Sequence, residues 1–165
     1  MKLLLLRHAE AAPTLPDDSR KLTKKGERQV AQLVEQLKGN SELEAISAIW
    51  HSPYTRAEDT ARLFKAGLGL RAPLIETTGL TPCDDAQATA ERIHREESAG
   101  KTLLVIGHNP HLESLCDYLL TGENYRQTVI FKKAGLVCLE SQPGIQIAGD
   151  YGRWSCCWYL IPRLL

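Results

Sequence analysis

Four consecutive leucines near the start of the chain, followed at once by an arginine and a histidine, constrain the fold most strongly. The leucines occupy residues 3–6 in the stretch MKLLLLRHAE, between charged residues. A short apolar run with charged flanks is typical of a strand that is buried on both faces of a sheet. A secretory signal would need a longer apolar run and a small-residue cleavage site, and neither follows. We therefore predict a central strand over residues 2–6, with Arg7 and His8 at its end.

The composition predicts an ordinary globular domain. The chain has 165 residues, 43% of them hydrophobic and 24% charged, with a formal net charge of zero. This length fits a single domain over residues 1–165 with a core of its own. The balanced charge favours neither nucleic acid nor a membrane surface as a partner, and no apolar window is long enough to span a bilayer. The five cysteines have no regular spacing, which predicts reduced, mainly packing thiols and a cytoplasmic location.

Apolar runs and amphipathic stretches alternate along the sequence. The runs predict strands at residues 2–6, 45–50, 72–76, 102–107, 135–140 and 153–160. Helices are expected between them, and the last two strands should pair antiparallel or lie at an edge. This order predicts an α/β three-layer sandwich, in which a mostly parallel central sheet carries helices on both faces.

The helix ends carry recognisable signals. Thr23 is the expected cap of a helix that runs to about Lys38. Another helix is expected over residues 86–97, and it should end near Gly100. Two further helices begin with a cap followed by proline in the first helical position. Ser52 and Pro53 start the first of these, which ends at Gly67 or Gly69, and Asn109 and Pro110 start the second.

Polar residues gather where three of the predicted strands end. Arg7 and His8 follow the first strand, Ser52 and Arg56 follow the second, and His108 follows the strand at 102–107. Ligands of open parallel sheets bind beyond the carboxyl ends of the strands, and helix N-termini at the same edge favour anions. The sequence therefore predicts a pocket for a doubly charged tetrahedral oxyanion.

This residue set suits phosphoryl transfer. A neutral imidazole is a nucleophile near pH 7 and can accept a phosphoryl group on nitrogen. Arginine side chains and a protonated second histidine would stabilise the charge that spreads over the phosphoryl oxygens. We expect the pocket to need neither a metal nor a cofactor, and the usual metal and nucleotide motifs are absent from the sequence.

Four blocks in order resemble the histidine phosphatase superfamily. They are RH at residues 7–8, LTKKGERQV at 22–30, SPYTRAEDTA at 52–61 and GH at 107–108. The resemblance implies a phosphoglycerate mutase-like fold and a metal-independent phosphatase with a phosphohistidine enzyme intermediate. It implies His8 as the phosphorylated nucleophile, His108 as the second catalytic histidine, and Arg7, Arg56 and His108 as the phosphate-binding set.

Within the superfamily the chain is most similar to the bacterial phosphohistidine phosphatases of the SixA type. The small size and the segment LTPCDD at 80–85 carry this likeness. It implies a phosphohistidine-bearing phosphotransfer domain of a signalling protein as the substrate. The mutase-type motif with a proton-donating glutamate is absent, and the candidates for a donor are Glu10, Asp84 and Asp85.

Two other functions stay open at this stage. One is a phosphatase of a small phosphomonoester, in which one of the three carboxyl groups is the proton donor. The other is a non-catalytic module that binds phosphohistidine or phosphate, although binding alone does not require both His8 and His108. His111 lies beside the predicted pocket and is a further candidate for substrate contact, whereas Cys83 has no basic neighbour and is expected to be inert.

Overall fold

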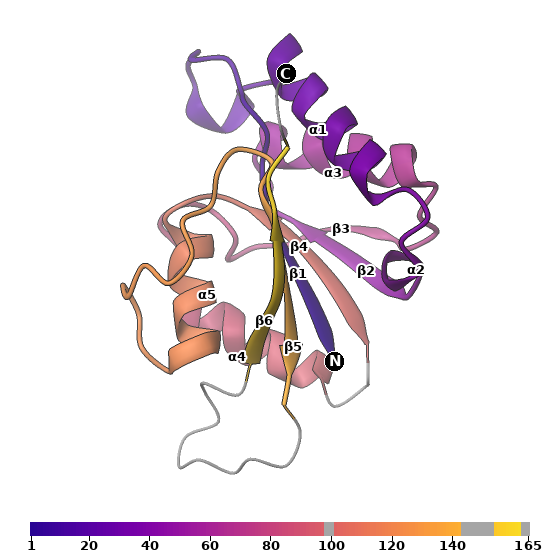
Figure 1. Ribbon diagram of the computed structural model, residues 1–165. Helices are drawn as coiled ribbons and strands as arrows, with labels where there is room; N and C mark the ends of the chain where they lie inside the picture. The colour runs from indigo at the N-terminus through magenta and orange to yellow at the C-terminus, as the bar shows by residue number, and fades with distance from the viewer. Residues whose placement is uncertain (98–100, 143–153, 163–165) are drawn as a thin grey trace.

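The computed structural model describes residues 1–97, 101–142 and 154–162, and the strands of these segments form one six-stranded sheet (Figure 1). Its order is β3-β2-β4-β1-β5-β6. The strands are β1 Lys2–Arg7, β2 Ile46–His51, β3 Leu74–Glu76, β4 Thr102–Gly107, β5 Leu136–Ser141 and β6 Trp154–Leu160. The pairs β3–β2, β2–β4 and β4–β1 are parallel, and β5 runs antiparallel to both β1 and β6. The predicted mostly parallel sheet with a late antiparallel pair is confirmed.

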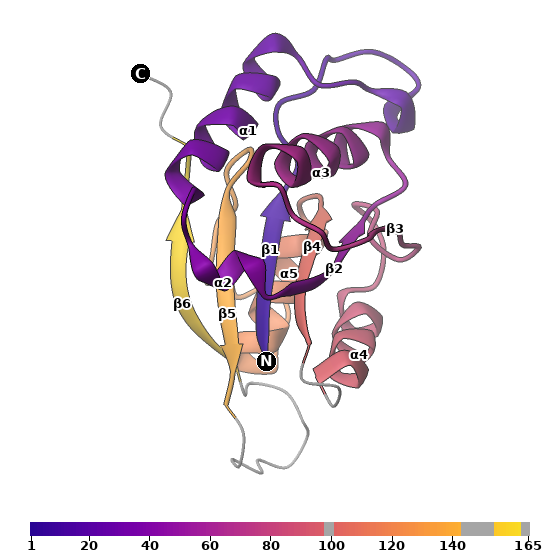
Figure 2. The ribbon, with the colours of Figure 1, turned by 90° about the vertical axis from the view of Figure 1, so that its right-hand side faces the viewer.

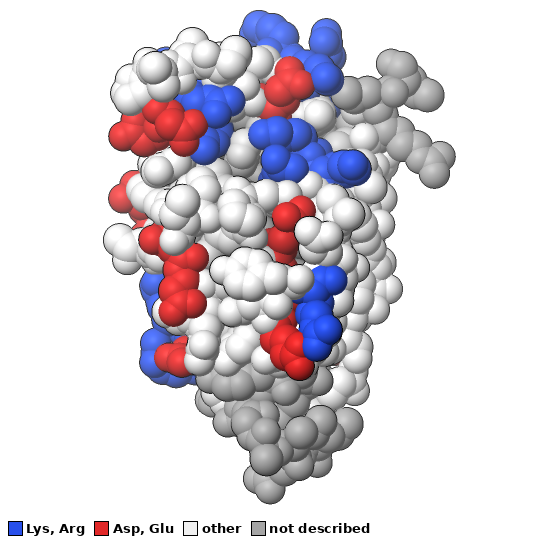
Figure 3. All heavy atoms as spheres, turned by 90° about the vertical axis from the view of Figure 1, so that its left-hand side faces the viewer, with Lys and Arg blue, Asp and Glu red and all other residues white. Residues whose placement is uncertain are grey.

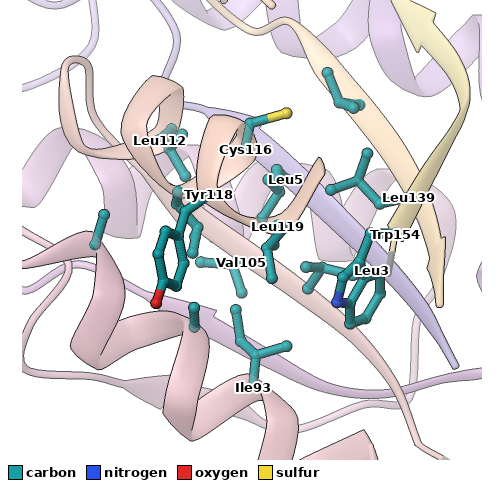
Figure 4. Packing of buried hydrophobic residues seen from close by; sticks show 14 of the residues in the cluster. Leu3, Leu5, Ile93, Val105, Leu112, Cys116, Tyr118, Leu119, Leu139 and Trp154 are labelled. Carbon is teal, nitrogen blue, oxygen red and sulfur yellow. The ribbon is translucent and has the colours of Figure 1, made fainter. Parts of the chain in front are cut away.

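The four leucines of β1 hold the centre of the molecule. Leu3 and Leu5 point to one face of the sheet and Leu4 and Leu6 to the other, and none is more than 1% exposed. Figure 4 shows Leu3 and Leu5 among the residues that pack against α5. Because successive side chains of a strand alternate between faces, both faces of β1 must be covered by helices.

Helices cover both faces, as the sequence predicts (Figures 1 and 2). Helices α1 (Lys24–Leu37) and α3 (Thr55–Leu68) pack on the face of Leu4, and α4 (Ala86–Glu97) and α5 (His111–Thr121) pack on the opposite face. The Thr23 hydroxyl accepts a hydrogen bond from the Gly26 amide at 3.0 Å and so caps α1. Helix α3 ends at Leu68, and the C-cap Gly69 has the left-handed φ of 64° that glycine adopts readily.

Two predicted helix starts are wrong. Helix α3 begins at Thr55 and not at Pro53, and α5 begins at His111 and not at Pro110. A cap needs a side-chain oxygen that faces the first-turn amides. The Ser52 hydroxyl is bonded to the ring of His108 and accepts from the amide of Tyr54, which precedes the first turn of α3. The Asn109 amide nitrogen donates to Glu113 and to the carbonyl of Phe131.

Other features of the described residues also differ from expectation. Two short helices were not predicted: the 3-10 helix η1 (Asp17–Ser19) in the segment between β1 and α1, and α2 (Ser41–Glu44). Two of the five cysteines are buried, as expected for packing thiols, but Cys83, Cys156 and Cys157 are exposed; none forms a disulfide. The helix end predicted near Gly100 and the turn between the last two strands lie outside the described residues. Across the described segments we find no helix with the length and apolar character needed to cross a bilayer.

We predict that Gly26→Ala destabilises the protein, although alanine favours a helix over glycine by roughly 1 kcal/mol. A Cβ atom at Gly26 would lie 2.1 Å from the carbonyl oxygen of Glu10, a backbone atom that cannot simply rotate away. Overpacking of this kind costs about 1–3 kcal/mol. Urea unfolding measures the change, with Arg28→Ala on the exposed side of the same helix as the control. A Gly26→Ala variant as stable as the wild type would contradict this contact.

Candidate active site

The pairing of β1 with β4 places two histidines side by side. Arg7 is in register with Gly107, so His8 and His108 are the next residues of adjacent parallel strands. The His8 amide donates to the Gly107 carbonyl at 3.0 Å, and the Ser52 amide donates to the Ile106 carbonyl at 3.0 Å. The two imidazole rings lie 4.9 Å apart, centroid to centroid. The structure thus brings together the predicted residues from all three strand ends.

His8 is held in the form that a nucleophile requires. Its Nδ1 lies 2.7 Å from the carbonyl oxygen of Ala9, which can only accept, so Nδ1 carries the proton and Nε2 keeps a lone pair. The Arg56 Nε–H donates to this Nε2 at 3.3 Å. Burial, followed by the positive charge of Lys133, lowers the pKa of His8 to about 2. The ring is therefore neutral at pH 7.

His108 is also neutral in the unliganded site. It is 1% exposed, and its Nε2 lies 2.8 Å from the Ser52 hydroxyl oxygen. Burial and the nearby Arg56 lower its pKa to about 3. The second histidine was expected to be protonated, but removal from water penalises the charged form. Its buried Nδ1 has no hydrogen-bond partner among the described residues.

The Arg56 guanidinium lies beneath the segment that follows β1. It is 4% exposed, and it donates from Nη2 to the Asp17 carboxylate at 3.0 Å and from Nη1 to the Asp17 carbonyl at 2.5 Å. Hydrogen bonds from Arg20 and then from Arg56 lower the pKa of Asp17. Asp17 was not among the site residues predicted from the sequence. The contact spans 39 positions, and no local pattern signals it.

Arg7 is directed toward the segment before β5. Its Nη1 donates to the Phe131 carbonyl at 2.7 Å, and its buried Nε has no hydrogen-bond partner among the described residues. Burial lowers the pKa of Arg7, although an arginine stays charged at any physiological pH. The side chain is half-buried at the same edge of the sheet as His8.

The three candidate proton donors, Glu10, Asp84 and Asp85, each bind other partners, and the structure does not bring them together. Glu10 pairs with Lys25 at 2.9 Å and accepts from the Thr23 hydroxyl at 3.0 Å. Asp84 accepts from the Thr81 amide of its own loop at 2.6 Å, and Asp85 accepts from the Gln87 amide in the first turn of α4 at 2.9 Å.

A cavity of about 360 Å³ lies next to the loop of Asp84 and Asp85. Cys83 and His111 also line it, and the buried His111 ring lies 3.1 Å from the Thr89 hydroxyl. Burial lowers the pKa of His111. Within the described residues, no group of three or more His, Cys, Asp or Glu side chains is placed to hold a metal ion.

Comparison with known proteins identifies the family. Residues 3–84 match the family model of the histidine phosphatase superfamily, branch 1. The protein histidine phosphatase SixA, solved with tungstate, superposes with a TM-score of 0.83 at 26% identity, covering 98% of this chain and 97% of that one. The chain belongs to the histidine phosphatase superfamily.

Solved structures of lower sequence identity share the fold. A protein assigned as SixA from Agrobacterium tumefaciens gives a TM-score of 0.73 at 20% identity, with 98% of each chain covered. A phosphoserine phosphatase mutant of Entamoeba histolytica, in complex with phosphoserine, gives 0.67 at 16% identity over 96% of this chain and 95% of that one. Curated proteins gave no significant match by sequence. The phosphoglycerate mutase-like fold predicted from the sequence is thus confirmed.

The buried neutral histidines predict an acid-sensitive fold. Their pKa values in the folded chain, about 2 for His8 and about 3 for His108, lie below the ordinary unfolded value of about 6.5. The unfolded chain therefore binds more protons, and stability falls as the pH drops below about 6.5. Between pH 7 and pH 5 each histidine should remove about 2 kcal/mol from the free energy of unfolding.

Urea unfolding of His108→Gln at the two pH values tests this expectation, because glutamine is neutral and can still hydrogen-bond to Ser52. The variant should lose less stability on acidification than the wild type. His94→Gln, at an exposed position of α4, is the matched control and should keep the wild-type loss. An equal loss in His108→Gln and the wild type would refute the lowered pKa.

Proposed function

We propose that this member of a phosphatase family is a metal-independent phosphohistidine phosphatase that acts on a signalling protein, with a phosphotransfer domain as substrate. The observation that carries the proposal is the buried pair of His8 and His108, with the unprotonated Nε2 of His8 facing Arg56. The overall likeness to the protein histidine phosphatase SixA supports this substrate class. We further propose a cytoplasmic location, in keeping with cysteines that form no disulfide.

The first half of the reaction transfers the phosphoryl group to His8. The lone pair of Nε2 attacks phosphorus, the bond from phosphorus to the substrate nitrogen breaks, and the leaving imidazole takes a proton from solvent. Arg7, Arg56 and His108 donate hydrogen bonds to the phosphoryl oxygens, where charge spreads in the transition state. A bound dianion would favour the protonated form of His108, which is neutral without it.

The second half returns the enzyme to its starting state. Water attacks the phosphorus of phospho-His8, the P–Nε2 bond breaks, and inorganic phosphate leaves with the oxygen of the water. The hydrogen bond from Nδ1 to the Ala9 carbonyl keeps the ring in one tautomer and orientation throughout.

The contacts of the carboxyl groups favour a phosphohistidine over an alkyl phosphate. Imidazole leaves more readily than an alkoxide, so the reaction depends less on a positioned acid. Glu10, Asp84 and Asp85 are bound to partners outside the His8 cluster. A small phosphomonoester phosphatase would need one of them to turn toward the leaving oxygen.

His8→Ala should abolish turnover, with a loss in kcat/KM beyond roughly a thousandfold, because the variant lacks the covalent nucleophile. Rapid quenching with a radioactively phosphorylated phosphotransfer domain should trap an acid-labile, base-stable label on the wild type and none on His8→Ala. His94→Ala is the control and should label normally. Tight binding of the phosphoprotein by the wild type without turnover would instead support a phospho-binding module.

Single alanine variants of Glu10, Asp84 and Asp85 separate the two enzymatic functions. On a phosphohistidine protein each should lose less than about tenfold in kcat/KM, below the 10²–10⁴ typical of a general acid. The same variants are measured on an alkyl phosphate and on p-nitrophenyl phosphate, whose leaving group barely needs a proton. A strong loss in one variant on the alkyl phosphate alone would favour the small-phosphomonoester phosphatase.

A further inference from the structure

A tight turn before β5 places Lys133 directly beside the nucleophile. The Ala134 amide donates to the carbonyl of His8 at 3.3 Å, and the Arg7 amide donates to the carbonyl of Gly135 at 3.1 Å. These two bonds extend the β1–β5 pairing past the end of the strand. The backbone of residues 134–135 therefore lies against the backbone of residues 7–8, and Lys133 is the adjoining residue.

The turn is fixed by contacts on its other side. The Lys132 amide donates to the Tyr159 hydroxyl oxygen at 2.8 Å, and that hydroxyl donates to the Ile130 carbonyl at 3.0 Å. A Cβ atom at Gly135 would lie 2.7 Å from the same hydroxyl oxygen, so the chain passes Tyr159 as closely as a glycine allows. Arg7 adds its bond to the Phe131 carbonyl. The position of Lys133 is therefore set by the sheet.

Lys133 is half-buried and has no ion-pair or hydrogen-bond partner for its ammonium group among the described residues. Other lysines of the chain are paired with carboxylates: Lys2, Lys24, Lys25, Lys38 and Lys101. Glu10, whose charge does reach Lys133, is already paired with Lys25. Partial burial of an unpaired ammonium is unfavourable in the unliganded protein, and a bound anion would relieve it.

The surroundings of Lys133 are strongly positive. Burial and the charges of Arg7, Arg20 and Arg56 lower its pKa to about 8, so it is mostly protonated at pH 7. Its charge in turn lowers the pKa of both His8 and His108, which locates it within electrostatic reach of the two rings. Figure 3 shows lysine and arginine side chains in the upper part of the face on the side of α5 and η1, with acidic side chains beside them. A cluster of cations around neutral histidines is complementary in charge to a dianionic group.

We propose that Lys133 is a further substrate-binding residue of this active site, and that its ammonium group donates a hydrogen bond to an oxygen of the phosphoryl group that His8 attacks. The inference rests on the proposed phosphatase function and adds a fourth cationic contact to Arg7, Arg56 and His108. The contact is electrostatic, so it acts on the phosphoryl group whatever the leaving group is.

Lys133→Gln removes the charge and Lys133→Arg keeps it, and Lys132→Gln is the matched control at the exposed neighbouring position. Isothermal titration calorimetry with tungstate measures binding of a tetrahedral oxyanion without any need for turnover. Lys133→Gln should bind tungstate about 10- to 100-fold more weakly, the scale of one hydrogen bond to a charged group. Lys133→Arg should stay much closer to the wild type, and Lys132→Gln should equal it.

Kinetics on two substrates complete the test. Lys133→Gln should lower kcat/KM by the same factor on phosphoimidazole and on p-nitrophenyl phosphate. Unchanged tungstate affinity in Lys133→Gln would overturn the proposal. A loss in kcat/KM on phosphoimidazole alone, equally large in Lys133→Gln and Lys133→Arg, would also overturn the proposal. That result would indicate that Lys133 donates a proton to the leaving group. A wild type that binds tungstate but hydrolyses neither substrate would refute the proposed function and leave the calorimetric result on Lys133 valid.

Discussion

The parallel pairing of β1 with β4 is the constraint on which the rest of the structure depends. The register that matches Arg7 with Gly107 leaves His8 and His108 as neighbouring residues beyond two adjacent strands. A shift of one residue would turn one ring to the opposite face, since strand side chains alternate. The leucines of β1 prevent that shift, because each is buried under helices on its own face of the sheet.

Burial then determines the chemical state of the site. Both rings are almost fully removed from water and surrounded by cations, so both are neutral at pH 7. A neutral imidazole with a fixed tautomer is ready to attack phosphorus, and the cations that disfavour a charged ring favour a dianionic substrate. The same electrostatic field therefore keeps the proposed nucleophile His8 neutral and would favour binding of the dianionic group that we propose it attacks.

Two segments that are distant in sequence from the strand ends hold the cations of the site in place. Residue Asp17 of η1 binds the guanidinium of Arg56 and orients it, and the turn at 131–135 binds both the side chain and the backbone of Arg7. The turn also contains Lys133, whose charge lowers the pKa of both histidines. Neither segment matches a recognisable motif, because each acts through a contact that forms only when the sheet has formed.

The sequence by itself determined the strand order in the chain, the sheet class, the helices on both faces and the gathering of Arg7, His8, Arg56 and His108 at one edge. These follow from the periodicity of apolar residues along the chain, together with the rule that parallel strands end at a common edge. The starts of α3 and α5 could not be read in this way, because Ser52 and Asn109 use their side chains for long-range bonds in place of capping. Only the tertiary structure decided the protonation of His108, the partner of Arg56 and the position of Lys133, because burial and charge depend on segments that fold together from distant parts of the chain.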